Sequence, residues 1–512
     1  INKYGTLEKL LKSADEIKQN KRRETLIENK DKALISKQLV TLMKDAPTNR
    51  ELSEFKLKDI DKDKLYAFLR EMEFNRLLSS VISAYGEPEL SGSIDEKKIK
   101  EKQQAISKKN YHLITNLDQI DEWIKEAEEV GEVAVDTETS SLDAHQADLI
   151  GVSLSSKIGK ACYIPIGHKS SKCLKKDDVI KKLKPLLEDP SVKKIGQNIK
   201  FDFIVLYKHG ITISSMEDTM LMSYVLDAGK NRHNMDTLSE IHLGHKTISF
   251  KEIVGTGKKE INFSEVEVDK AKDYAAEDAD ITFRLYKKFI KNLKLEKMVN
   301  IYEIFEKPLI KILAFMEMEG IEVDSKFLKS LSLKFEKKIK NLEKEVFKIS
   351  KKEFNIASPK QLGEIIYNDL KIAGLKKTKK GSFATSASVL EDLAFKGHKF
   401  PQLILDWRQV SKLKNTYSDS LPEHINPTTK RVHTSFLLAA TTTGRLASSD
   451  PNLQNIPIKS EDGKDIRKAF SAKKDHLLIS ADYNQIEMRI LADLADVKEL
   501  KKAFKNNEDI HS

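Results

Sequence analysis

The chain has 512 residues, which is too long for one hydrophobic core of ordinary size, so several domains are expected. Hydrophobic residues make up 39% and charged residues 33%, the balance of a soluble globular protein, and no apolar run is long enough to cross a bilayer. Lys and Arg outnumber Asp and Glu by 89 to 79, a net charge of +10, which suggests a polyanionic partner such as nucleic acid. The alternative is a proteome rich in lysine, because Lys is spread along the whole chain.

The two cysteines bear on the redox compartment of the protein, and the two chain ends bear on the extent of its sequence. Cys162 and Cys173 have no C-x-x-C or zinc spacing, so we expect free thiols in a reducing compartment. The N-terminus shows no signal-peptide pattern. The chain begins at Ile1 without Met and stops at Ser512, so both ends are expected to be cuts through a longer protein.

In chain order, residues 1–85 show apolar side chains at helical spacing and predict short helices. Residues 86–110 are polar and lysine-rich, which is typical of a linker. Strand patterns over 132–136, 149–154 and 161–166 come first and helical patterns follow them, so we expect a mixed α/β domain over 111–295.

The second half of the chain is predicted to be mainly helical up to residue 421, with Phe327, Leu328, Leu331 and Phe335 on one helix face. Two further strands are predicted near the C-terminal end, over 432–438 and 477–482. A helix with Ile486, Ile490 and Leu494 on one face is expected to follow.

Carboxylates recur in the α/β region in a pattern that favours a metal site. Asp136 and Glu138 stand two residues apart at the end of a predicted strand, so both point to the same side. Asp202 follows at a strand-to-helix junction. Asp278 comes four residues after Tyr274, which places these two on one helix face.

The chemistry of phosphodiester cleavage explains why such residues would be needed together. Cleavage requires an activated water and stabilisation of negative charge on the phosphate. Two Mg²⁺ or Mn²⁺ ions about 3.5–4 Å apart, held by hard carboxylate oxygens, supply both. A single D-x-E pair taken alone lies more often in a solvated loop than in a metal site. Asp280 is predicted to be exposed to solvent, because it lies on a different helix face from Asp278.

Three segments, VDTETSSLD, GQNIKFD and YAAEDAD, resemble the exonuclease motifs of the DEDD superfamily in its tyrosine-containing branch. The resemblance implies a ribonuclease H-like fold and 3′→5′ exonuclease activity. It implies that Asp136, Glu138 and Asp278 hold one metal ion and that Asp136 bridges to a second. Asp202 would reach the second ion largely through water, and Tyr274 would position the attacking water.

The same resemblance assigns contacts with the substrate and further ligands. Leu142 and Asn198 match positions that touch the terminal nucleotide. The implied cofactor is a pair of Mg²⁺ ions, with Mn²⁺ as the alternative, and the implied substrate is a single-stranded 3′ end of DNA.

The segments TTTGRLASSDPNLQNIP and SADYNQIEMR resemble family A DNA polymerases of bacteria, and the resemblance extends over essentially all 512 residues. It implies that Asp482 is one of two catalytic metal carboxylates and that Glu487 is the steric gate against a ribose 2′-hydroxyl. Arg445 would contact the minor groove of the primer–template. Gln485 is also carried over as a substrate position, and His511 would lie near the incoming triphosphate. The alternative interpretation of Asp482 and Arg445 is a strand-end Asp and a surface Arg.

The resemblance also divides the chain. Residues 1–85 would be the C-terminal helical part of a 5′-nuclease domain, 86–110 a linker, 111–295 the mixed-sheet exonuclease domain, 296–421 a helical thumb and 422–512 a partial palm with motif A. The expected fold class is therefore α/β and multidomain. The lysine run Lys376–Lys380 would contact phosphates or form a solvated loop, and the sequence leaves both open.

The sequence departs from the family by omission. It contains no fingers helix with its Lys and Tyr after motif A and no His-Asp-Glu segment like motif C. We therefore expect exonuclease activity only, whereas a longer parent would use primer–template DNA and deoxynucleoside triphosphates for template-directed synthesis. The resemblance implies a monomeric, cytoplasmic, nucleoid-associated bacterial protein with no membrane contact.

Two other interpretations compete with this one. A stand-alone exonuclease of the ribonuclease D type, acting on RNA, would need neither polymerase-like segment. A DNA-binding fragment with a decayed nuclease would not be expected to keep all four carboxylates.

Overall fold

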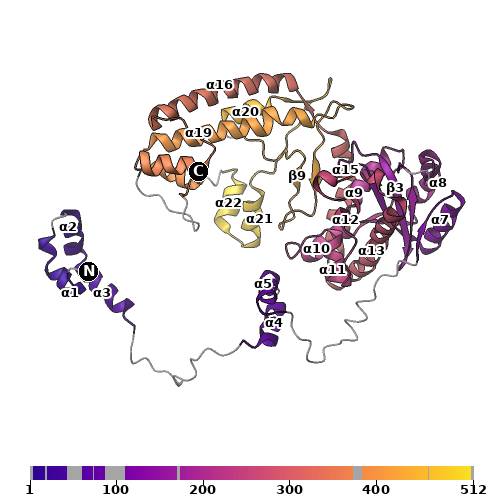
Figure 1. Ribbon diagram of the computed structural model, residues 1–512, viewed down its shortest axis with the longest axis horizontal. Coiled ribbons are helices and arrows are strands. Elements are labelled where there is room, and N and C mark those ends of the chain that lie inside the picture. Colours follow the sequence, from indigo (N-terminus) through magenta and orange to yellow (C-terminus); the bar gives the residue numbers. More distant parts are fainter. Residues whose placement is uncertain are drawn as a thin grey trace. The chain divides into compact units, whose positions relative to one another are not determined.

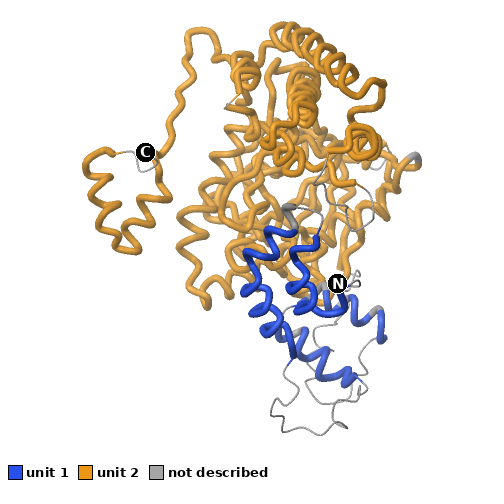
Figure 2. The backbone as a smooth tube through the Cα atoms, turned by 90° about the vertical axis from the view of Figure 1, so that its left-hand side faces the viewer, with its two compact units in different colours: residues 1–94 blue, residues 95–512 orange. Residues whose placement is uncertain are grey.

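The computed structural model describes residues 4–17, 20–42, 60–72, 74–86, 110–169, 173–372, 383–458 and 460–508. The chain forms two compact units, residues Ile1–Ile94 and Asp95–Ser512 (Figure 2). Most of the predicted linker, the lysine run Lys376–Lys380 and His511 lie outside the described residues. None of the helices in the described ranges combines the length and apolarity that crossing a membrane requires.

The first unit is helical, as its apolar spacing predicts. The Thr6 hydroxyl caps the first helix by accepting a hydrogen bond from the Lys9 backbone N–H. Leu11 and Ala14 are buried beside it. The α-helices of this unit are α1 (Leu7–Lys12), α2 (Asn20–Glu28), α3 (Lys30–Val40), α4 (Lys62–Glu71) and α5 (Asn75–Tyr85).

The second unit begins with a six-stranded mixed sheet in the order β1-β4-β3-β2-β5-β6. The central strand β2 pairs antiparallel with β3 and parallel with β5. The strands predicted over 132–136, 149–154 and 161–166 are confirmed, with slightly different bounds. The sheet consists of β1 (Tyr111–Leu113), β2 (Glu132–Thr139), β3 (Leu149–Lys157), β4 (Lys160–Pro165), β5 (Lys193–Gly196) and β6 (Met216–Asp218).

Helices pack against this sheet and bury its apolar side chains. The longest, α13, contacts β1 to β5, and α9 contacts β2, β5 and β6. Ala271, Ala275 and Ala279 recur at four-residue spacing on α13 and are fully buried, and their short side chains let the helix approach the strands closely. The helices of this part of the chain, some of which pack on α7 or α13 rather than on the sheet, are α7 (Asp118–Val130), α8 (Lys176–Glu188), α9 (Ile199–Tyr207), α10 (Thr219–Asp227), α11 (Met235–Leu243), α12 (Phe250–Val254) and α13 (Val268–Leu295).

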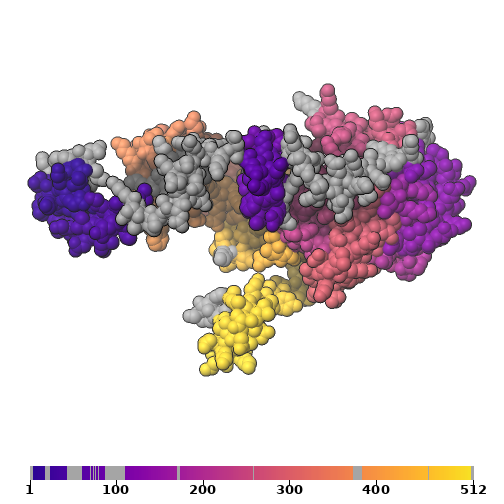
Figure 3. All heavy atoms as spheres, turned by 90° about the horizontal axis from the view of Figure 1, so that it is seen from below, coloured from indigo at the N-terminus to yellow at the C-terminus, as the bar shows by residue number. Residues whose placement is uncertain are grey.

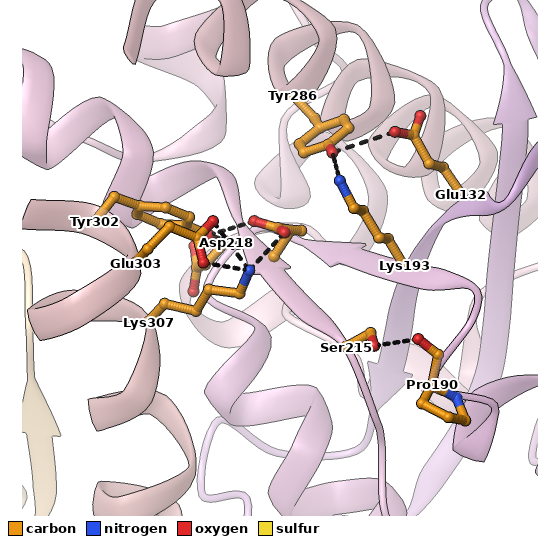
Figure 4. Close-up of polar contacts among 10 residues, drawn as sticks. Glu132, Pro190, Lys193, Ser215, Asp218, Tyr286, Tyr302, Glu303 and Lys307 are labelled. Atoms are coloured by element: carbon orange, nitrogen blue, oxygen red, sulfur yellow. Dashed lines mark hydrogen bonds and ion pairs between the residues drawn. The ribbon is translucent and has the colours of Figure 1, made fainter. Parts of the chain in front are cut away.

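Polar side chains join the edge of the sheet to the helices that follow (Figure 4). The Tyr302 hydroxyl donates to Glu217 Oε2 and accepts from the Asp218 backbone N–H, both at 2.9 Å. Lys307 Nζ donates to Glu217 Oε1 at 2.7 Å. These bonds attach η6 (Tyr302–Glu306) and α15 (Lys307–Glu319) to β6.

Helices dominate residues 325–424, as predicted. Three of the four apolar side chains predicted to share a helix face (Leu328, Leu331 and Phe335) are buried on α16 (Ser325–Ser350). In Figure 1, α16 runs beside α19 (Lys399–Leu413) and α20 (Glu461–Arg467). The other elements of this part are α17 (Pro359–Glu364), η7 (Ile365–Asp369), α18 (Ala387–Phe395), η8 (Lys414–Asp419) and η9 (Leu421–His424).

Two short strand pairs connect these helices. β7 (Glu322–Val323) pairs with β10 (Phe470–Ser471), and β8 (Ser435–Leu437) pairs with β9 (Ala447–Ser449). The strand predicted over 432–438 is therefore shorter than expected.

The strand predicted over 477–482 is wrong. This segment has no strand or helix, and Leu477 and Ile479 are 89% and 90% exposed. An isolated strand cannot satisfy its backbone hydrogen bonds with a neighbour, and no strand in the described ranges pairs with this one. The helix predicted after it is present as α21 (Ile486–Leu494). Together with α22 (Lys498–Lys505) it leaves most of its side chains open to solvent (yellow in Figure 3).

The prediction that Asp280 is solvated is also wrong. Asp280 is fully buried and accepts hydrogen bonds from the Tyr111 hydroxyl, the Gly159 N–H and Arg284 Nε at 2.9, 2.8 and 3.0 Å. Because α13 is covered by the sheet on one side and by other helices elsewhere, its buried face is wider than an amphipathic pattern suggests.

Candidate active site

The site begins at the carboxyl end of β2. In the β2–β3 pairing, Asp136 lies opposite Ser153 and Glu138 opposite Gly151, so both acidic side chains emerge on one face of the sheet. A Cβ added to Gly151 would lie 2.2 Å from the Tyr163 hydroxyl oxygen. Glycine is required there because the Tyr163 ring occupies that space.

Helix α13 brings a third carboxylate to this point. Carboxylate oxygens of Asp136, Glu138 and Asp278 all lie within 4.8 Å of one another. Tyr274 lies one helical turn before Asp278, and burial together with the charge of the nearby Asp278 carboxylate raises the pKa of its hydroxyl. The i, i+4 spacing in the sequence therefore places both groups at the same site.

Helix α9 supplies the fourth carboxylate. Asp202 is buried, and its Oδ1 accepts two hydrogen bonds from Thr137, from the N–H at 2.9 Å and from the hydroxyl at 2.6 Å. The helix begins at Asn198, whose φ of 65° lies in the left-handed region. Asp218 fixes this start by accepting from the backbone N–H groups of Asn198 and Ile199 at 3.1 and 3.0 Å.

Without a counter-charge, the four carboxylates repel one another, and burial disfavours their ionised forms. Burial raises the pKa of Asp136 to about 6 and raises the pKa of Asp202 and Asp278. Burial and the charges of the other three carboxylates raise the pKa of Glu138 well above its ordinary value. Buried Glu138 Oε1 has no hydrogen-bond partner in the described part of the chain.

A divalent cation fits this donor set. The oxygens are hard ligands, they converge from two elements, and one buried oxygen is left without a proton donor. A bound cation would relieve the repulsion that raises the pKa values. Asp136, Glu138 and Asp278 form a group of three possible metal ligands. Among the described residues, no other group of three or more acidic, histidine or cysteine side chains has ligand atoms this close together.

Asp136, Glu138 and Asp278 line a cavity of about 880 Å³. Phe250, Phe263 and Tyr274 form part of its wall, with ring centroids 6.1 Å apart in each pair. Leu142 also lines it and is 92% exposed. A cavity with acidic groups on one side and flat aromatic faces on another suits a ligand that has both a phosphate and a base.

A second cavity of about 470 Å³ adjoins the first, because Leu142 and Phe201 line both. Asn198 lines this second cavity rather than the first. The two residues predicted to touch a terminal nucleotide therefore lie at or near the junction of the two cavities.

The residues predicted from the polymerase-like segments lie elsewhere. Arg445 Nη2 is 3.6 Å from Glu487 Oε1, and both side chains are largely exposed. Asp482 is exposed on the segment without secondary structure, and Gln485, with a φ of 53°, precedes α21. The structure thus gathers Asp136, Glu138, Tyr274 and Asp278 around one cavity, and it attaches Asp202 to Thr137 between the first two, but it does not bring Asp482 there.

Two positioning residues were missed in the sequence. Asp218 precedes an apolar helical pattern, which is the signal of an N-cap, and that signal could have found it. Thr137 carried no such signal, because its contact with Asp202 joins residues far apart in the chain.

Three family models match successive parts of the chain. Residues 1–63 match a 5′-3′ exonuclease C-terminal SAM fold, residues 111–294 match a 3′-5′ exonuclease, and residues 325–512 match DNA polymerase family A.

Individual relatives and a solved structure agree with these matches. DNA polymerase I of Rhizobium leguminosarum is 41% identical over 100% of this chain and 58% of its own length. DNA polymerase I of Pseudomonas aeruginosa is 40% identical over 95% of this chain and 53% of its own length, so the chain spans somewhat more than half of these relatives. A structure described as the POL domain of Pol1 from M. smegmatis, in complex with DNA primer-template and dNTP, matches with a TM-score of 0.66. It is 28% identical and covers 78% of this chain and 65% of the other.

Proposed function

Because this chain belongs to the family A DNA polymerases, the family of bacterial DNA polymerase I, we propose that its carboxylate site removes nucleotides from the 3′ end of DNA. The observation that carries the proposal is the convergence of three carboxylates within 4.8 Å, one with an unpartnered buried oxygen, in a cavity with aromatic walls. In the whole protein this activity would proofread newly made DNA.

Asp136, Glu138 and Asp278 would hold one divalent cation, and Asp136 and Asp202 would face a second. We propose Mg²⁺, with Mn²⁺ as the alternative. Bound there, the cations would neutralise phosphate charge and make water a better nucleophile.

The protein's own groups orient the reactants. The Tyr274 hydroxyl, in the same cavity as Asp278, orients the attacking water towards phosphorus. The aromatic wall stacks against the terminal base, while Leu142 and Asn198 contact the terminal nucleotide. Water adds to phosphorus, the bond to the 3′ oxygen breaks, and that oxygen takes up a proton. The products are a nucleoside 5′-monophosphate and a strand with a new 3′-hydroxyl.

Template-directed DNA synthesis is a separate proposal for the whole protein. Asp482 would hold catalytic metal, Glu487 would exclude a 2′-hydroxyl and Arg445 would contact the primer–template, with Gln485 and His511 near the incoming nucleotide. The family A match over residues 325–512 supports it.

The nuclease proposal is tested with a 5′-labelled single-stranded DNA. With Mg²⁺ the protein should produce a ladder of strands shortened from the 3′ end, and a chelator should stop it. Asp202→Ala should lower the rate by on the order of a hundredfold or more, because a metal-facing carboxylate is lost. Its affinity for DNA should persist in a gel-shift assay.

Unchanged degradation by Asp202→Ala would contradict the site. The matching RNA strand is the control for the second candidate function, a ribonuclease D type enzyme. RNA degraded faster than DNA would favour that candidate instead.

A further inference from the structure

Outside the carboxylates, a buried ion pair joins α9 to α15. Lys200 on α9 and Glu317 on α15 are 5% and 3% exposed, and Lys200 Nζ donates to Glu317 Oε1 at 2.5 Å. Two charges are seldom taken out of water for stability alone, because the desolvation cost offsets most of the attraction. This pair therefore calls for another explanation.

The same carboxylate oxygen has a second donor. The Phe436 backbone N–H, in β8, donates to Glu317 Oε1 at 2.6 Å. His433 Nδ1 lies 2.7 Å from the Glu317 carbonyl oxygen, and the His433 ring stacks on that of His145 with centroids 4.5 Å apart. Glu317 is thus a single point at which α9, α15 and β8 meet.

These elements are the walls of the second cavity. Lys200 and Phe201 line it from α9, Ser435 and Leu437 line it from β8, and Glu317 lies between the two walls. Asp136, Glu138 and Asp278 lie on β2 and α13, outside this joint. Asp202 is two residues from Lys200 on α9, but two hydrogen bonds from Thr137 hold it to β2. A change at Glu317 can therefore shift the β8 wall while the Thr137–Asp202 bonds keep α9 in place.

We propose that Glu317 is a positioning residue for the nuclease reaction. It fixes the α9 and β8 walls of the second cavity against each other and so aligns the stretch of DNA next to the 3′-terminal nucleotide. The inference rests on the proposed exonuclease function.

Two substrates separate this role from a general structural one. The p-nitrophenyl ester of thymidine 5′-monophosphate is a single nucleotide, which needs only the carboxylate cavity and the edge that it shares with the second cavity near Leu142 and Asn198. A single-stranded DNA oligonucleotide must extend further into the second cavity. Glu317→Gln should raise KM for the oligonucleotide by on the order of ten- to a hundredfold, the size of effect expected from misalignment remote from the chemistry. It should leave kcat/KM for the ester unchanged.

Glu319→Gln is the matched control. Glu319 is on the same helix, but its side chain is exposed and its ion pairs with Lys473 and Arg431 are at the surface. Both substrates should be hydrolysed normally by this variant.

A double variant, Lys200→Met with Glu317→Leu, guards against misfolding, because a buried ion pair is often replaced by apolar side chains without loss of stability. It lacks the acceptor for the Phe436 N–H, so it should show the same rise in oligonucleotide KM. A normal oligonucleotide KM in the double variant, or a parallel loss of ester hydrolysis in Glu317→Gln, would overturn the inference. If the unaltered protein hydrolysed neither substrate, that result would instead overturn the proposed function.

Discussion

At the scale of single residues, the chemistry depends on a few hydrogen bonds that hold acidic groups in place. Asp202 accepts two hydrogen bonds from Thr137, and Asp218 accepts from the backbone N–H groups of Asn198 and Ile199 at the start of α9. These bonds are not visible in the motif spacing, yet together they fix the position of a carboxylate that the proposed reaction would use.

The Thr137 hydroxyl can be tested directly. Thr137→Val keeps the shape of the side chain but removes the bond to Asp202 Oδ1. A hydrogen bond to a charged group contributes about 1.5–3 kcal/mol, so we expect kcat to fall by roughly ten- to a hundredfold with little change in KM for DNA. Thr137→Ser keeps the hydroxyl and should retain most of the activity. Equal kinetics for the two variants would rule out a role for this bond.

The raised carboxylate pKa values predict a dependence on pH. In the folded, metal-free protein the pKa of Asp136 is about 6, so the folded protein binds a proton at Asp136 more tightly than the unfolded chain does. Without metal, folding stability should therefore decline as pH rises from about 4, the ordinary carboxylate pKa, through about 6. The raised pKa values of Glu138, Asp202 and Asp278 extend the effect upward.

Metal binding should oppose this decline, because a cation needs the ionised carboxylates and protons compete with it. Mg²⁺ should consequently raise Tm more at about pH 8 than at about pH 5. The comparison is made by calorimetry with saturating Mg²⁺ and with a chelator. An equal rise in Tm at both pH values would contradict the proposed ligand set.

At the scale of elements, three segments from different parts of the chain form the site. β2 supplies Asp136 and Glu138, α9 supplies Asp202 and α13 supplies Tyr274 and Asp278. The sequence predicted a strand that ends at Asp136, a strand-to-helix junction at Asp202 and a helix through Tyr274 and Asp278. It failed for residues 477–482, where an equally apolar run has no partner strand among the described residues.

This exposed segment should be sensitive to protease. Residues 474–484 have neither a strand nor a helix beyond hydrogen-bonded turns, and their side chains are mostly exposed. Within the described ranges, brief trypsin treatment should therefore cut first after Lys473 or Lys474, ahead of sites inside α13 or α16. Mass spectrometry of the early fragments identifies the cut, and earlier cleavage within α13 would contradict the expectation.

At the scale of the whole molecule, the site proposed for hydrolysis is well formed and the site proposed for synthesis is not. Asp482 is exposed, and within the described ranges it belongs to no group of three close metal-ligating side chains. The division of the chain into five parts with boundaries at 85, 110, 295 and 421 stays a prediction.

A protein made from the printed 512 residues should accordingly give no primer extension with deoxynucleoside triphosphates and Mg²⁺, because one carboxylate cannot hold two catalytic cations. The same preparation should shorten the primer. A full-length family A polymerase serves as the positive control for extension. Robust extension by the 512-residue protein would show that the synthesis site is complete without a His-Asp-Glu segment.

The sequence alone predicted which acidic residues come together. Period-two and period-four spacing placed Asp136 with Glu138 and Tyr274 with Asp278, and the motif resemblance added Asp202. Local geometry suffices for such pairs because strand and helix periods are fixed by the backbone.

The contacts that surround those residues are visible only in the tertiary structure. In the folded protein Asp280 is buried, although its position on the helix predicted exposure to solvent. Thr137 contacts Asp202, and Glu317 contacts both Lys200 and Phe436. Such contacts link residues distant in the chain and depend on how the layers pack, so no periodicity encodes them. For the same reason an apolar run such as 477–482 becomes a strand only where another strand lies beside it.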